Sequence, residues 1–144
     1  MNRPEPLPFR LRVPGRDAID GEGAWQISYR IEGLLHLVGN TVTFEWSGTR
    51  QTQQVSFSGV VDDTEPLPIE WMDVPLQSIT EVRLLGGWWR TRLELRARRL
   101  DAFDGVPSAK PGGVTLRIHR RDREIAVKMR ETIEAVNERN PRAQ

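Results

Sequence analysis

Side chains that support acid–base, nucleophilic or metal chemistry are few in this chain of 144 residues. There is no cysteine, and the two histidines, His36 and His119, stand in no metal-binding spacing and near no nucleophile motif. Asp62, Asp63 and Glu65 lack the spacing of a calcium-binding loop, so we interpret them as an exposed acidic turn. The sequence therefore predicts a protein that is not an enzyme and that has no catalytic, cofactor-binding or metal-binding residues.

Arginine and tryptophan side chains form the one group that indicates a binding surface. They gather in the stretch 81–100, where Gly86 and Gly87 separate two arms of alternating apolar residues. Arginine and tryptophan are enriched in protein interfaces, and arginine is also attracted to anionic membranes. The predicted interaction surface has eight members: Arg83, Leu85, Trp88, Arg90, Arg92, Arg96, Arg98 and Arg117. The alternative is that Trp88 only covers Leu85 while the arginines are solvated.

A β-hairpin must position this surface. The two glycines predict a two-residue turn, because both central residues of such a turn often adopt positive φ. This register places Val82 opposite Thr91 and Leu84 opposite Trp89. Since side chains alternate between the two faces of a strand, Trp89 is expected in the core and Trp88 outside. Replacement of Trp89 by alanine should then cost about 3 to 5 kcal/mol, whereas the same change at Trp88 should cost little.

Charge is segregated along the chain, although the net charge is only +1. The stretch 17–82 contains two basic and eleven acidic residues, and the stretch 83–130 contains thirteen basic and five acidic residues. Such asymmetry predicts a charged partner, unless strands from the two halves interleave in space and cancel it. The small net charge argues against nucleic acid as that partner.

Length and composition predict one domain with a proper core. We divide the chain into an extended Pro-rich N-terminal arm (1–16), a single domain (17–140) and a C-terminal tail (141–144). The arm is expected to be a mobile tail, or else a short strand that docks on a sheet edge through its alternating apolar residues. The chain has no leader-like segment and no apolar run long enough to span a membrane, so we expect a cytoplasmic protein.

Alternating apolar residues predict strands over most of the chain. The first strand should run from Trp25 to Leu37, with a bend at Gly33, and Gly39 and Asn40 should form a hairpin turn to a strand at 41–47. A polar loop is expected at 48–53. Further strands are expected at 54–61, 68–74, on both sides of the diglycine turn and at 114–119. The sequence thus predicts an all-β domain of seven strands.

A helix is expected at the end of the domain. Ile125, Met129, Ile133 and Val136 are spaced by four, four and three residues, which predicts an amphipathic helix at 122–138. Its apolar stripe must pack on an open end or face of the β structure.

The order of seven strands followed by one helix resembles the pleckstrin-homology-like (PH-like) fold, and the sequence of the second half resembles that of bacterial members of this fold. The resemblance lies in VPLQSITEVRL at 74–84, GGWWRTRLEL at 86–95 and LDAFDGVPSAKPGGVTLRI at 100–118. It implies a partly open barrel of seven antiparallel strands in two near-orthogonal sheets, capped by the C-terminal helix. Phosphoinositide-binding members of the family carry a basic cluster at the first hairpin turn, and the turn 38–41 has no cation here. A closed eight-stranded barrel of lipocalin type is the second expectation for the fold.

We therefore expect a non-enzymatic PH-like binding or scaffold module that acts through protein–protein contacts and forms homo-oligomers. Sheet edges, and the groove between the strand beginning at Glu81 and the helix, are the expected docking sites. The expected partners are another protein or a second copy of the chain, with no nucleic acid and no cofactor. The alternative is peripheral binding to an anionic membrane through the Trp and Arg face. An enzyme or small-molecule carrier that uses the barrel interior ranks third.

Overall fold

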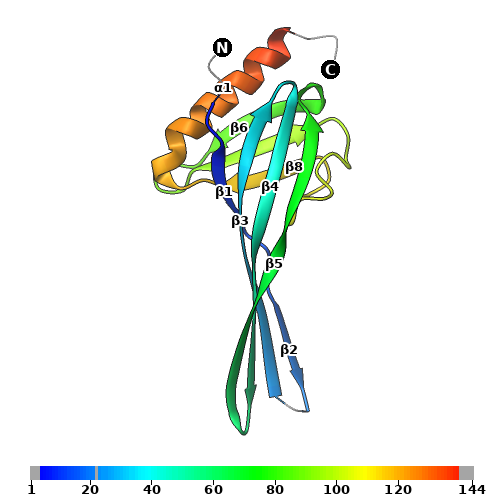
Figure 1. Ribbon diagram of the computed structural model, residues 1–144, viewed down its shortest axis with the longest axis vertical. Coiled ribbons are helices and arrows are strands. Elements are labelled where there is room, and N and C mark those ends of the chain that lie inside the picture. The colour runs from blue at the N-terminus through cyan, green and yellow to red at the C-terminus, as the bar shows by residue number, and fades with distance from the viewer. Residues whose placement is uncertain (1–3, 22, 140–144) are drawn as a thin grey trace.

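The structure is a computed structural model that describes residues 4–21 and 23–139. It consists of antiparallel β-structure and a C-terminal helix (Figure 1). The strands are β1 (Leu7–Leu11), β2 (Arg16–Asp20), β3 (Gly23–Val38), β4 (Thr41–Ser56), β5 (Gly59–Pro75), β6 (Ile79–Leu85), β7 (Arg92–Ala97) and β8 (Gly113–Arg117). The helices are two short 3-10 helices, η1 (Leu76–Ser78) and η2 (Arg120–Asp122), and α1 (Arg123–Arg139).

The strands form one sheet that does not close. Their order is β5-β4-β3-β1-β8-β7-β6, and β2 pairs with the part of β3 that β1 leaves free. Because β5 and β6 lie at opposite ends of this order, the expectation of a closed lipocalin-type barrel is wrong. The mostly antiparallel β-structure and the single C-terminal helix are confirmed, whereas seven strands in two sheets are not.

The β3–β4 hairpin has the register that its sequence predicts. Leu37 lies opposite Val42 and Leu35 opposite Phe44, and the turn residue Gly39 has a φ of +59°. Gly33 is required because a Cβ there would lie 2.5 Å from Cζ of Phe9, so the glycine makes room for a phenyl ring of β1. The inward side chains of this hairpin form one wall of the core.

Beyond the core, the sheet continues as a long four-stranded ribbon of β2, β3, β4 and β5, which projects away from α1 (Figure 1). The predicted loop at 48–53, strand at 54–61 and acidic turn at 62–66 are therefore wrong. Strand β4 continues to Ser56, the chain turns at Phe57 and Ser58, and β5 runs through the acidic stretch. Thr, Gln and Val side chains suit a strand exposed on both faces, but they give no alternation that would reveal it.

Strand β1 corrects the expectation of a mobile N-terminal tail. It lies between β3 and β8 in the interior of the sheet, and Leu7, Phe9 and Leu11 are buried. The alternative interpretation, a short docking strand, describes this segment better. These residues therefore contribute to the domain core, although they precede the predicted domain boundary at residue 17.

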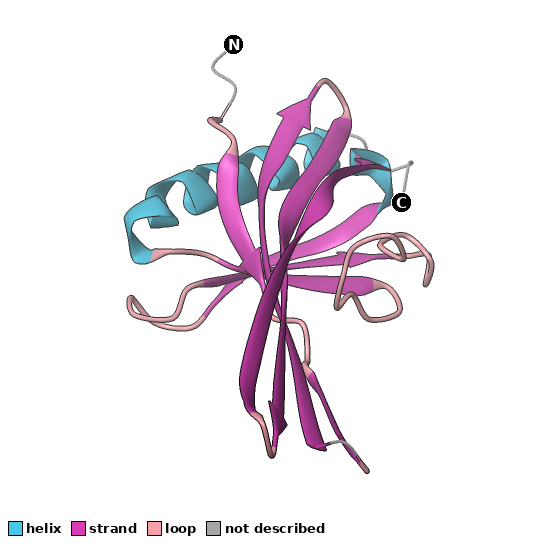
Figure 2. Ribbon diagram, turned by 60° about the horizontal axis from the view of Figure 1, so that its bottom comes forward, coloured by secondary structure: helices cyan, strands magenta, loops and turns pink. Residues whose placement is uncertain are grey.

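The core lies between the curved sheet, α1 and the loop that joins β7 to β8 (Figure 2). Met129 and Ile133 of the predicted helical stripe are fully buried, and Ile125 and Val136 pack at its margin. From the loop, the fully buried Phe103 packs edge-to-face on Phe44, with ring centroids 5.9 Å apart. The predicted helix is confirmed within one residue at each end. No helix of the described residues has the length and apolar character needed to span a membrane.

Candidate functional site

The diglycine hairpin exists, but its connection is a six-residue loop, Gly86–Thr91, instead of a two-residue turn. Strand β6 pairs with β7 such that Leu85 lies opposite Arg92 and Leu84 opposite Leu93. The prediction that Trp89 lies in the core is therefore wrong, since its side chain is 74% exposed. The register differs from the predicted one by four residues, an even number, so the inward and outward faces of the two strands are as predicted.

Contacts at both ends of this loop explain the longer connection. Gly86 has a φ of +79°, and a Cβ there would lie 2.0 Å from the carbonyl oxygen of Arg90. Thr91 is buried, its hydroxyl accepts a hydrogen bond of 3.0 Å from Nη1 of Arg123, and its carbonyl accepts one from the Ile118 amide. Thr91 is thus fixed against α1 and the residue that follows β8, and the loop cannot shorten to the two glycines.

Trp88 and Trp89 stand together on this loop. Their rings meet edge-to-face with centroids 4.6 Å apart, and the guanidinium of Arg120 lies 5.5 and 5.7 Å from the two rings. Such cation–π contacts hold an arginine close to aromatic faces. Both indoles nevertheless stay largely exposed, at 56% and 74%. The loop and η2 therefore expose a cluster of two aromatic side chains and one cationic side chain to solvent.

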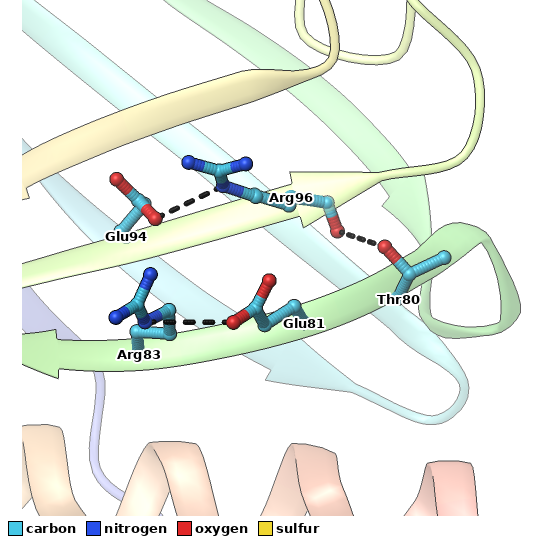
Figure 3. A network of polar contacts seen from close by, with 5 residues as sticks. All are labelled: Thr80, Glu81, Arg83, Glu94 and Arg96. Atoms are coloured by element: carbon cyan, nitrogen blue, oxygen red, sulfur yellow. Dashed lines mark hydrogen bonds and ion pairs between the residues drawn. The ribbon is translucent and has the colours of Figure 1, made fainter.

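Two arginines of the predicted surface are neutralised by neighbours on their own strands (Figure 3). Arg96 Nε donates to Glu94 Oε1 at 3.0 Å, and Arg83 Nε lies 3.4 Å from Glu81 Oε1. Thr80 completes the network through a hydrogen bond to the backbone carbonyl of Arg96. The outer face of β6 and this part of β7 is consequently a mixed-charge surface.

The outer face of β1, β7 and β8 differs, because arginines there lie directly opposite one another. Arg117 of β8 faces Arg10 of β1 on one side and Arg92 of β7 on the other. Arg10 at one end of this row forms an exposed ion pair with Glu32 at 3.8 Å. Like charges placed directly across a sheet destabilise it, and an anion between them removes that repulsion.

A hollow of about 590 Å³ follows this row and carries no acidic residue. We name it the arginine groove, and its side chains that we use below are Arg10, Arg12, Arg90, Arg92, Arg117, Arg120 and Trp89. A second hollow, of about 490 Å³, shares three of these arginines and adds Lys110 and the ion-paired Arg96 and Glu94. A third hollow shares Arg10, Arg117 and His119 with the groove and includes Glu32, Glu45 and Asp122, so the purely basic surface ends there.

The structure brings together part of the predicted interaction surface and adds residues to it. Arg90, Arg92 and Arg117 line the arginine groove, and Trp88 stands at its rim beside Arg120. The remaining members, Arg83, Leu85, Arg96 and Arg98, lie outside the groove, although Arg96 borders the adjoining hollow. The groove residues that sequence reasoning missed are Arg10, Arg12, Arg120 and Trp89, the last of which was expected in the core. The alternation of Arg10 and Arg12 with buried residues was the available signal for the first two.

Neither histidine belongs to a constellation that resembles a catalytic or metal site. Nε2 of His36 lies 3.0 Å from Oε2 of Glu45, and Nδ1 of His119 accepts the Arg121 amide at 3.1 Å. Within residues 4–21 and 23–139, no three His, Asp or Glu side chains are arranged to hold a metal ion.

Acidic and basic residues remain segregated in space. Five acidic side chains of β5, at one end of the sheet order, are exposed: Asp62, Asp63, Glu65, Glu70 and Asp73. The arginine groove lies on β1, β8 and β7, towards the other end. The two halves of the chain therefore do not interleave enough to cancel their charges.

No family model matches this chain, and searches of curated proteins and of solved structures also gave no match. The residues of the groove thus provide the basis for inferring what it binds.

Proposed function

We propose that this protein is a PH-like, non-enzymatic binding module that acts through protein–protein contacts, and that the arginine groove receives an extended acidic segment of its partner. The observation that carries the proposal is a concave surface with six arginines, an exposed tryptophan and no acidic residue. Such a surface attracts anionic ligands over long distances and contacts them through charge-assisted hydrogen bonds.

The PH-like assignment has support in how the sheet is divided. Strands β1 and β8 are joined through a single residue pair, Arg10 with Arg117, whereas the other neighbours pair over several residues. The sheet therefore has a narrow junction between β5-β4-β3-β1 and β8-β7-β6, as expected where two sheets of an open barrel meet. A helix that follows the last strand and buries its apolar stripe is consistent with this assignment.

Most arginines of the groove lack a charged partner in the described ranges of the chain. Within the described part of the chain, Arg12, Arg90, Arg92 and Arg117 form no ion pair. Three of the groove arginines repel one another across the strands. A carboxylate-rich ligand gives these guanidiniums the bidentate partners that they lack.

The two tryptophans beside the groove favour a protein ligand. Trp88 and Trp89 offer exposed apolar area beside the arginines, and this combination is typical of the anchor residues of protein interfaces. A peptide that carries both carboxylates and apolar side chains would use both kinds of contact.

Binding of a fluorescein-labelled decaglutamate peptide, followed by fluorescence anisotropy, tests the proposal. We expect saturable binding at about 50 mM salt and much weaker binding at about 500 mM, because salt screens exposed charges. The double variant Arg92→Glu/Arg117→Glu should bind about tenfold more weakly or worse.

The matched control is Lys128→Glu/Arg139→Glu, which changes the net charge equally on exposed positions of α1. It should bind decaglutamate almost as the unmodified protein does. Equal losses in the two double variants would mean that net charge alone governs binding, and the arginine groove would then have no special role.

Attachment to an anionic membrane is the second candidate, because two exposed tryptophans stand beside arginines on one loop. Cosedimentation with vesicles of phosphatidylcholine alone, or mixed with phosphatidylserine, distinguishes the two. The protein-binding proposal predicts no cosedimentation with either vesicle at about 150 mM salt. Cosedimentation only with phosphatidylserine, lost in Trp88→Ala/Trp89→Ala, would favour the membrane instead.

A further inference from the structure

We propose that the acidic segment that enters the arginine groove is Val60–Glu65 of β5 in a second copy of this chain, so that copies associate head to tail. This inference rests on the proposed function, since it names the partner of the same groove. The basic groove and the acidic segment are both present on one chain, at separate places.

The segment carries carboxylates that are free to bind. Asp62 and Asp63 are exposed and have no side-chain partner among the residues that the structure describes. Glu65 is exposed and pairs with Arg50 of the neighbouring strand. Alternate residues of a strand point to opposite faces, so Asp62 lies on one face, and Asp63 and Glu65 lie on the other about 7 Å apart.

The segment also carries apolar side chains suited to the tryptophans. Val60 and Val61 directly precede the acids and are 58% and 61% exposed. Val61 shares a face with Asp63 and Glu65, so the segment seated with these two acids on the arginines would bring Val61 towards Trp88 and Trp89 at the rim of the groove. The segment thus has apolar residues followed by charged ones, and the groove has tryptophans at its rim followed by arginines.

The position of the segment in the fold leaves it accessible. Strand β5 is the end strand of the sheet order, and this part of it belongs to the ribbon that projects beyond the core (Figure 1). Natural proteins commonly protect an exposed edge strand with charges or proline. Pro66 and Pro68 follow the segment, and the three acidic residues within 60–65 disfavour pairing with another acidic strand while leaving this edge accessible to a basic surface.

Contact between two different surfaces is heterologous, and it differs from a two-fold dimer in a way that can be measured. Each copy retains one unused groove and one unused segment after the first contact, so association continues to chains or rings. A variant that lacks either surface should therefore not self-associate. Two variants, one without the groove and one without the segment, should form a single contact when mixed, and association should end at a dimer.

Sedimentation velocity of two variants and their mixture tests this inference. The groove variant is Arg92→Glu/Arg117→Glu, and the ribbon variant is Asp62→Lys/Asp63→Lys, with all four positions exposed. We expect the unmodified protein to form species larger than a dimer as its concentration rises, and each variant to remain monomeric. An equimolar mixture should form a dimer that does not grow further, and high salt should dissociate it.

A mixture that stays monomeric, or a groove variant that still associates alone, would overturn the inference. The ribbon variant keeps its groove, so its binding of labelled decaglutamate separates the two proposals. If it binds the peptide and the mixture does not dimerise, the groove binds acidic segments but not this one. If the mixture does not dimerise and the ribbon variant also does not bind the peptide, the proposed function itself is wrong. Far-UV circular dichroism matching the unmodified protein shows that each variant is folded.

Discussion

Two neighbouring tryptophans illustrate, at the scale of the residue, where alternation along a strand ceases to apply. Alternation would place Trp88 and Trp89 on opposite faces, yet both are exposed because the chain around them is a loop. The buried residue is instead Thr91, which the Arg123 side chain and the Ile118 backbone amide hold in place. A contact with a residue 32 positions later decides this geometry, and no local pattern contains it.

Replacement of Trp89 by alanine should change the free energy of unfolding by no more than about 0.5 kcal/mol, because the side chain is exposed. Phe103→Ala should cost about 3 to 5 kcal/mol, because it removes a fully buried ring that packs on Phe44. Urea denaturation followed by circular dichroism measures both. A loss at Trp89 as large as that at Phe103 would place the indole in the core after all.

Gly86→Ala should destabilise the protein by about 1 to 3 kcal/mol, because φ is positive there and the new Cβ would collide with the carbonyl of Arg90. Gly87 is the matched control, since a Cβ at that position meets open space. Its replacement by alanine should be close to neutral in the same denaturation experiment. Similar costs at the two glycines would contradict the loop geometry.

At the scale of the element, the elements that bury one face were predictable and those that do not were missed. The β3–β4 register followed from apolar residues that must meet on the inside, and α1 followed from a stripe of period 3.6. The distal part of the ribbon has neither face in the core, so its sequence lacks such a signal. Strand β1 was not predicted as part of the sheet because prolines surround it, although the alternation of its apolar and polar residues gives the buried face correctly.

Leu7→Ala tests the place of β1 in the sheet. Leu7 is fully buried in the core and lies opposite Leu35 of β3, so its truncation should cost about 2 to 5 kcal/mol. Glu5→Ala, two residues earlier and exposed, is the control and should have little effect. Indistinguishable midpoints for the two variants in thermal denaturation would mean that the N-terminal segment does not pack on the sheet.

The arginine row across β1, β8 and β7 should reduce the stability of the protein. Arg117→Gln removes the central charge, so it should raise the free energy of unfolding by up to about 1 kcal/mol at low salt. The gain should shrink as salt increases, because screening weakens the original repulsion. Arg98→Gln lies outside the row and serves as the control. A loss of stability in Arg117→Gln would show that the arginines are already compensated.

At the scale of the whole molecule, the separation of charge along the sequence persists in space. The sequence therefore predicted a charged surface and several of its members, notably Arg90, Arg92 and Arg117. Alternation indicates that Arg10 and Arg12 face away from the core, but it does not place them beside Arg117, because that position depends on the insertion of β1 next to β8. Pairing between the two ends of a chain is a property of topology, which short-range patterns do not encode.

The central claim is that the arginine groove binds acidic segments, and the five tryptophans allow the site to be located directly. Titration of the protein with decaglutamate, followed by NMR of the indole N–H signals, is the most direct measurement. We predict that the signals of Trp88 and Trp89 shift together and saturate, while those of Trp25, Trp46 and Trp71 stay in place. Shifts centred on Trp71, or none at peptide concentrations that saturate binding, would contradict the account.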